Sequence, residues 1–207
     1  HHDEDEHHDE GEHHDEGEHH DEGEHHDEGE HRHGRYDPHF WFDPLRVSSV
    51  IGNIATVLSE IDPGGKTYYS QRSEAYKQEL ERLDAHISSQ IATIPEERRK
   101  IMSGHESLGY LEERYDILVL QAIIPSLSSE TGPTPQDLVE AINLVRKHNI
   151  PAIFVEAETT GKSATRIAQE TGVRVAKGLS VETLKEGESY INFMEHNIEV
   201  IVSNLIE

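Results

Sequence analysis

The chain has 207 residues, no cysteine and a formal net charge of −24 at pH 7, and its first 30 residues hold 16 acidic side chains and no basic one. The other 177 residues carry 26 acidic and 18 basic side chains, so their net charge of −8 is that of a mildly acidic globular protein. The lack of cysteine excludes disulfides and thiolate metal sites. The lack of a basic cluster argues against nucleic acid as a partner, and no apolar run approaches the 18 residues of a transmembrane helix.

A histidine-rich tract opens the chain, with five consecutive six-residue units that each begin with two histidines. Because residues 1–30 contain no apolar side chain, we expect residues 1–35 to be disordered. Two imidazoles and several carboxylates per unit predict loose, exchangeable zinc binding, and a merely solvated acidic linker is the alternative. The chain starts without methionine or a signal peptide, so we expect it to be the C-terminal part of a longer protein. The tract's histidines are His1, His2, His7, His8, His13, His14, His19, His20, His25, His26, His31 and His33.

Two helices are predicted after the tract. The aromatic segment Tyr36–Pro44 is framed by two Asp-Pro pairs, and its final Asp-Pro pair is typical of a helix start. Apolar residues at helical spacing predict a helix over about 45–61, which Asp-Pro-Gly-Gly ends. A longer pattern predicts a second helix over about 66–91, which at 1.5 Å per residue would span roughly 39 Å.

The rest of the chain alternates between strand and helix. Short apolar runs predict strands at about 101–103, 117–120, 152–155 and 173–175, and the intervening patterns predict helices that end near residues 115, 149 and 171. A last helix is predicted over about 188–206. This alternation indicates an α/β fold with a parallel sheet that is flanked by helices.

Four residues outside the tract are candidates for a site. His105 follows a predicted strand and a glycine, at the sheet edge where ligand sites of open α/β sheets gather. His39 lies in a loop and is either a ligand or a turn histidine packed beside Trp41. Glu182 is a candidate ligand or a solvated acid. Glu156 ends a predicted strand, where it would orient a ligand histidine or pair with a helix N-terminus or a cation. The Gly-x-Ser-x-Gly, P-loop, HExxH and GxGxxG motifs are all absent, so we do not expect an enzyme.

Four segments resemble, in order, a known family. They are DPHFWFDP at 37–44, GHESLGY at 104–110, IFVE at 153–156 and SYINFM at 189–194. Together they resemble the zinc- or manganese-binding substrate-binding proteins of bacterial ABC importers, over nearly everything outside the tract.

The resemblance implies two α/β lobes joined by a long helix, with the metal held between them. It assigns residues 36–65 to the end of the N-terminal lobe, 66–93 to the linking helix and 94–207 to the C-terminal metal-binding lobe. His39 and His105 match ligand histidines, and Glu182 falls where many members place an aspartate ligand. A further ligand histidine of the family would precede this chain. We therefore expect weakened metal affinity, and exposed apolar surface around Phe40, Trp41 and the 45–61 helix.

The function implied by the resemblance is capture of zinc outside the cytoplasm, in the periplasm or on a membrane anchor, by a monomer that delivers the ion to an ABC permease. Histidine ligands favour zinc, and manganese is the alternative. Because ligation needs neutral imidazoles, we expect zinc affinity to fall as the pH drops through about 6. Two other functions stay open: a zinc buffer or chaperone that acts through the tract, and an adhesin-type protein that kept the fold.

Overall fold

The structure is a computed structural model that describes residues 37–104, 106–121, 134–156 and 161–206. Contacts divide the chain into His1–Arg35 and Tyr36–Glu207, and the fold described below is that of the second unit. The histidine-rich tract and its predicted disorder lie outside the described residues. None of the described helices is both long enough and apolar enough to cross a membrane.

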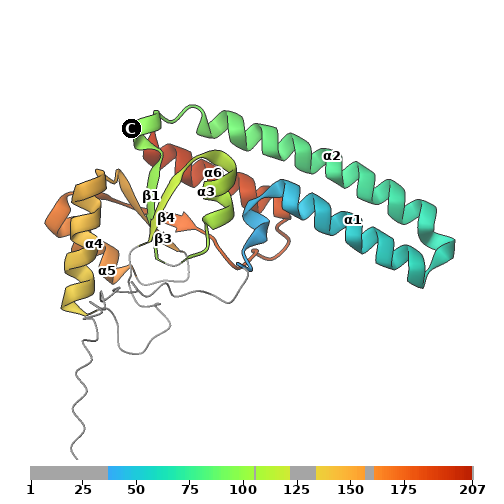
Figure 1. The fold of residues 1–207 in the computed structure, drawn as a ribbon, viewed down its shortest axis with the longest axis horizontal. Coiled ribbons are helices and arrows are strands. Elements are labelled where there is room, and N and C mark those ends of the chain that lie inside the picture. Colours follow the sequence, from blue (N-terminus) through green and yellow to red (C-terminus); the bar gives the residue numbers. More distant parts are fainter. Residues whose placement is uncertain (1–36, 105, 122–133, 157–160, 207) are drawn as a thin grey trace, which may run out of the picture. The chain divides into compact units, whose positions relative to one another are not determined.

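The unit begins with a helical hairpin (Figure 1). A single 3-10 turn at Phe40–Phe42 leads into α1, Pro44–Ile61, and after a second turn at Pro63–Gly65 the chain continues as α2, Lys66–Ile91. Asp43 caps α1 by accepting hydrogen bonds from the backbone amides of Leu45 and Arg46, with Pro44 as the first helical residue. The predicted bounds of both helices are confirmed.

A four-stranded parallel sheet follows, in the order β2-β1-β3-β4. Its strands are β1 Lys100–Ser103, β2 Leu118–Gln121, β3 Ala152–Glu156 and β4 Arg174–Leu179. Every residue of β3 is buried, as expected of an inner strand with helices on both faces. The predicted fold class, α/β with a parallel sheet flanked by helices, is confirmed.

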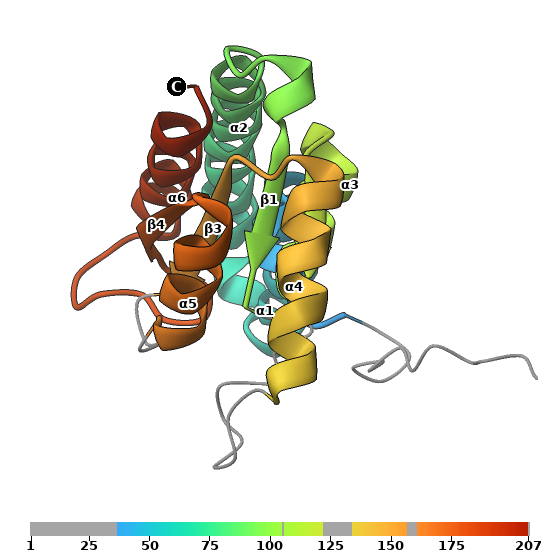
Figure 2. The ribbon, with the colours of Figure 1, turned by 90° about the vertical axis from the view of Figure 1, so that its left-hand side faces the viewer.

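Helices cover both faces of the sheet (Figure 2). On one face α4, Pro135–His148, and α5, Lys162–Thr171, pack against Met102, Ile153 and Val155. On the other face α2, α3 (Gly109–Tyr115) and α6 (Tyr190–Leu205) enclose a larger core that includes the alternate strand residues Ile101 and Phe154. This alternation is the two-residue period of a strand that is buried on both faces.

Two boundaries differ from the sequence prediction by two residues or more. β4 runs to Leu179, although Lys177 and Gly178 interrupt its apolar pattern, because it pairs with all of β3 across an irregularity at Val155 and Glu156. α6 begins at Tyr190, two residues later than predicted, since Ser189 is its N-cap and accepts a hydrogen bond from the amide of Asn192.

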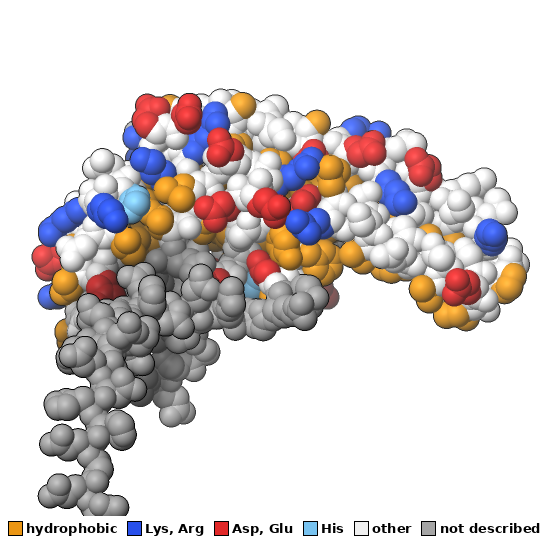
Figure 3. Space-filling model, viewed as in Figure 1, with side chains coloured by type: hydrophobic (Ala, Val, Ile, Leu, Met, Phe, Trp, Pro, Cys, Tyr) orange, Lys and Arg blue, Asp and Glu red, His pale blue; other side chains and the backbone are white. Residues whose placement is uncertain are grey.

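The apolar face of α1 is only partly covered. Ile54, Val57, Leu58 and Ile61 are exposed, with Ile61 at 76%. Figure 3 shows hydrophobic side chains along the lower side and at the far end of the hairpin. The sequence analysis expected exposed apolar surface around Phe40, Trp41 and this helix. The second half of α1 shows that exposure, whereas Phe40 and Trp41 are half-buried.

Candidate metal site

The carboxyl ends of the four parallel strands meet at one edge of the sheet, and most of the candidate residues follow them. Glu156 is the last residue of β3, where it lies in register with Leu179, the last residue of β4. Ser180, Val181 and Glu182 come directly after β4. His105 comes two residues after the end of β1 and lies outside the described residues. Among the described candidates, Glu156 and Glu182 therefore lie at or just after the edge where ligand sites of parallel sheets form.

His39 is the buried histidine of the turn before α1, with 5% of its surface exposed. One carboxylate oxygen of Asp37 accepts a hydrogen bond from the His39 backbone amide at 2.9 Å and contacts its ring Nδ1 at 2.7 Å. An ionised carboxylate can only accept, so this contact favours a proton on Nδ1, and in the neutral form of that tautomer the ring lone pair is on Nε2. A carboxylate behind one ring nitrogen is the arrangement that fixes the tautomer and orientation of metal-bound histidines. The ring also packs beside Trp41. The geometry is therefore compatible with His39 as a metal ligand and with His39 as a turn histidine packed beside Trp41.

Trp41 joins the His39 segment to the loop after β4. Its ring meets the His39 ring edge to face, with centroids 5.3 Å apart. Its indole Nε1 donates a hydrogen bond of 3.0 Å to the carbonyl oxygen of Val181, a residue 140 positions away in the chain. Glu182, the next residue, is therefore held in the neighbourhood of His39.

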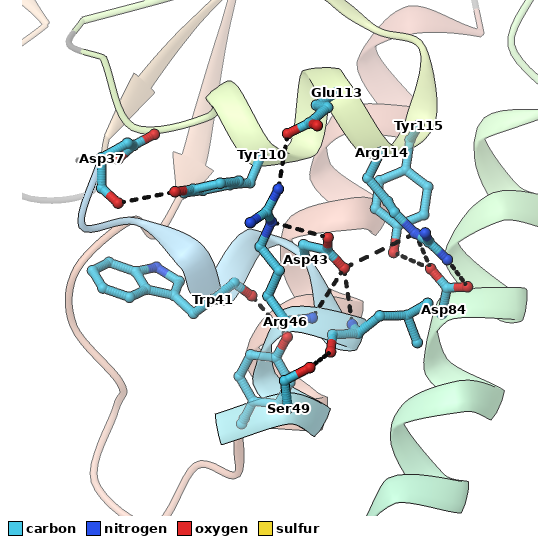
Figure 4. A network of polar contacts seen from close by, with 12 residues as sticks. Asp37, Trp41, Asp43, Arg46, Ser49, Asp84, Tyr110, Glu113, Arg114 and Tyr115 are labelled. Atoms are coloured by element: carbon cyan, nitrogen blue, oxygen red, sulfur yellow. Dashed lines mark hydrogen bonds and ion pairs between the residues drawn. The ribbon is translucent and has the colours of Figure 1, made fainter. Parts of the chain in front are cut away.

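Two tyrosines anchor the segment 37–41 to helices that pack on the sheet. The Tyr110 hydroxyl of α3 donates to the backbone oxygen of Asp37 at 3.1 Å, and the Tyr190 hydroxyl of α6 donates to that of Trp41 at 2.7 Å. Figure 4 shows the Tyr110 side chain reaching Asp37. Burial, with the nearby Tyr76, Asp43 and Asp84 adding to it, raises the pKa of Tyr190, so its hydroxyl keeps its proton at physiological pH.

A polar network secures the start of α1 against α2 and α3 (Figure 4). Asp84 of α2 accepts hydrogen bonds from the Arg114 guanidinium at 2.9 and 2.7 Å and from the Tyr115 hydroxyl at 2.9 Å. Burial works to raise the pKa of Asp84, but these hydrogen bonds and the charge of Arg114 bring that pKa below its ordinary value. Arg46 lies over the Tyr110 ring, 4.3 Å from its centroid, and contacts Glu113 at 3.1 Å.

The two candidate carboxylates differ in exposure. Glu156 is 9% exposed, whereas Glu182 is exposed on its loop, and both have interaction partners. Among the described residues no three His, Asp or Glu side chains form a group that could hold a metal ion. The complete ligand set thus stays a prediction, because His105 and the tract histidines lie outside the described part.

Sequence reasoning missed Asp37, Trp41, Tyr110 and Tyr190 as supports of His39. The sequence did contain a signal for Asp37. In turns, an aspartate side chain commonly accepts a hydrogen bond from the backbone amide two residues further along the chain, which here is that of His39. The contacts of Trp41 and the two tyrosines join segments far apart in the chain, and no local pattern predicts them.

Comparison with known proteins decides the family. The model of the family described as ZnuA, zinc-uptake complex component A, periplasmic, matches residues 2–204. The chain belongs to this family. The resemblance in the sequence is thereby confirmed, and the family supplies a component of transporters, not an enzyme.

Some relatives are named for manganese and others for zinc. The manganese-binding lipoprotein MntA of Halalkalibacterium halodurans is 33% identical over 173 residues, which are 82% of this chain and 57% of that protein. The high-affinity zinc uptake system protein ZnuA of Bacillus subtilis is 29% identical over 175 residues, 82% of this chain and 54% of the relative. The chain therefore spans little more than half the length of these relatives.

Solved structures show the same fold. The periplasmic zinc-binding protein TroA of Treponema pallidum superposes with a TM-score of 0.73 at 27% identity, over 83% of this chain and 64% of that one. The laminin-binding protein Lbp of Streptococcus pyogenes superposes with a TM-score of 0.70 at 29% identity, over 82% and 65% of the two chains.

Proposed function

We propose that this chain is the metal-binding part of the substrate-binding component of an ABC importer, which captures zinc outside the cytoplasm and delivers it to a membrane permease. The observation that carries the proposal is the buried His39 with Asp37 behind its Nδ1, beside the carboxyl edge of a parallel sheet. Family membership agrees with it. Manganese is the alternative cargo, since relatives are named for either metal.

In this proposal His39, His105 and Glu182 bind the ion, and Glu156 orients a ligand. Two imidazoles and one carboxylate leave one position of a four-coordinate zinc to another donor. The division inferred from the resemblance is part of the proposal: residues 36–65 end an N-terminal lobe, 66–93 link, and 94–207 form the metal-binding lobe. The histidines of the tract gather ions loosely for this site.

The test is zinc titration by calorimetry of the full chain and of three histidine variants. We expect H39A and H105A each to remove the tight binding event, and H86A to leave it unchanged, because His86 is an exposed histidine on α2. Neutral imidazoles are required, so the affinity of the wild type should be weaker at pH 5.5 than at pH 7.5. A tight event that survives H39A and H105A would contradict the proposal. Repeating the titration with manganese measures the preference between the two ions.

The second candidate function is a zinc buffer that acts through the tract. Ten histidines within residues 1–30 favour it. It predicts several weak binding events that disappear when residues 1–33 are deleted and persist in H39A. The importer proposal predicts one tight binding event that persists when residues 1–33 are deleted and disappears in H39A. One set of titrations therefore separates the two functions.

A further inference from the structure

Within the part of the chain that the structure describes, Trp41 contacts both His39 and the loop after β4. Its ring meets the His39 ring edge to face with centroids 5.3 Å apart, and its indole nitrogen donates to the Val181 carbonyl at 3.0 Å. Val181 is 1% exposed, and Glu182, which follows it, is exposed. The hydrogen bond thus fixes the last buried peptide before the candidate carboxylate ligand.

The backbone that carries Trp41 is itself held in place. The Tyr190 hydroxyl donates to its carbonyl oxygen at 2.7 Å. The next residue, Phe42, is fully buried and packs against Phe193 of α6, with ring centroids 6.0 Å apart. The backbone of Trp41 is therefore anchored on α6, while its indole contacts both His39 and the loop after β4.

We propose that Trp41 is a positioning residue for the metal: its indole N–H holds the Val181–Glu182 loop at the distance from His39 at which both residues bind one ion. This inference rests on the proposed function and adds a determinant of its affinity. The donor is the essential part, because a phenylalanine at this position would keep the aromatic contact with His39 and lose the hydrogen bond to the loop. Groups that orient ligands from outside the coordination sphere typically change metal affinity about 10- to 100-fold.

The experiment compares the zinc affinities of the full chain and of the variants W41F, E182A and W41F/E182A, by competition with a chromophoric chelator. We expect W41F to weaken binding about tenfold. In the E182A background the same change should cost less than about twofold, because Trp41 acts through the Glu182 loop. Y115F is the matched control: it also deletes one half-buried hydrogen bond of an aromatic side chain, to Asp84, and should leave zinc affinity unchanged.

A second variant and a metal-free readout guard against general loss of structure. Benzothienylalanine in place of Trp41 substitutes sulfur for the indole N–H and keeps the shape, and it should reproduce the W41F effect. Amide hydrogen exchange of residues 180–184 in the metal-free protein should speed up in both Trp41 variants and stay unchanged in Y115F.

The outcomes separate the two hypotheses. Unchanged zinc affinity in W41F, or an equal loss with and without E182A, overturns the role of Trp41 even when H39A abolishes binding. Tight zinc binding that is indifferent to H39A overturns the proposed function, and the positioning role fails with it. A loss in W41F that disappears in the E182A background, together with faster loop exchange, supports the inference.

Discussion

Removing the Asp37 carboxylate tests the structural basis of the proposed site directly. One oxygen of Asp37 accepts from the His39 amide and holds the ring proton on Nδ1, so D37A deletes the group that fixes both the tautomer and the ring orientation. Loss of such a partner costs 10- to 100-fold in metal affinity. The Asp37 side chain is 34% exposed, so water replaces part of what is lost. We therefore expect the lower end of that range, about tenfold or 1.4 kcal/mol.

The assay is competition for zinc with a chelator whose concentration strips the loosely held ions of the tract and leaves one tight ion. D37N should fall between the wild type and D37A, because its amide oxygen accepts the same hydrogen bonds without the charge. E113A is the control, since it removes an equally charged carboxylate that pairs with Arg46 on the surface. If D37A binds zinc as tightly as the wild type while H39A does not, Asp37 does not orient a ligand and the reasoning fails.

Three further predictions concern stability and surface. Because the pKa of Asp84 is lowered in the folded state, its stabilising contribution to folding is fully present above its unfolded pKa of about 3.9 and is lost as the pH falls through its folded pKa. D84N should therefore lower the free energy of unfolding by about 1 kcal/mol at pH 7. In urea titrations, the difference in unfolding free energy between D84N and the wild type should shrink below about pH 4. The Ser107 hydroxyl is buried without a hydrogen-bond partner in the described structure, so S107A should raise the thermal midpoint, with a gain of about 1 kcal/mol, and a lower midpoint would show that the hydroxyl is satisfied. The exposed apolar face of α1 should bind a fluorescent hydrophobic probe, and V57K/I61K should reduce that signal while changing the unfolding free energy by less than about 0.5 kcal/mol.

Much of the fold follows from local sequence signals. The 26 residues of α2 run from Lys66 to Ile91 as its apolar spacing predicts, because Leu80, Leu83 and Ile87 must all face one core. The start of α4 is likewise marked locally, by Thr134, which forms a reciprocal capping box with Asp137. In each case the deciding interactions join residues within a few positions of one another, and a linear pattern records them.

The supports of the candidate site were less predictable. The motif around His39 identified the histidine, but its link to the Glu182 loop depends on a hydrogen bond between Trp41 and Val181, 140 residues apart. The length of β4 likewise depended on pairing with β3 and not on its own composition, which includes Lys177 and Gly178. Such features arise only once the sheet has brought the distant segments together, so local periodicity carries no trace of them.

The contrast between His39 and Glu182 suits the two tasks of a carrier under the proposed function. His39 is 5% exposed, oriented by Asp37 and packed on Trp41, so little conformational entropy is lost when it binds an ion. Glu182 is exposed at the start of a loop that continues to α6. In the proposed site, water could therefore replace it as a ligand. A fixed histidine favours capture at low concentration, and an exchangeable carboxylate provides a route for release to the permease. Tightening the loop, for example by a disulfide between it and α6, should therefore slow zinc dissociation more than it speeds association.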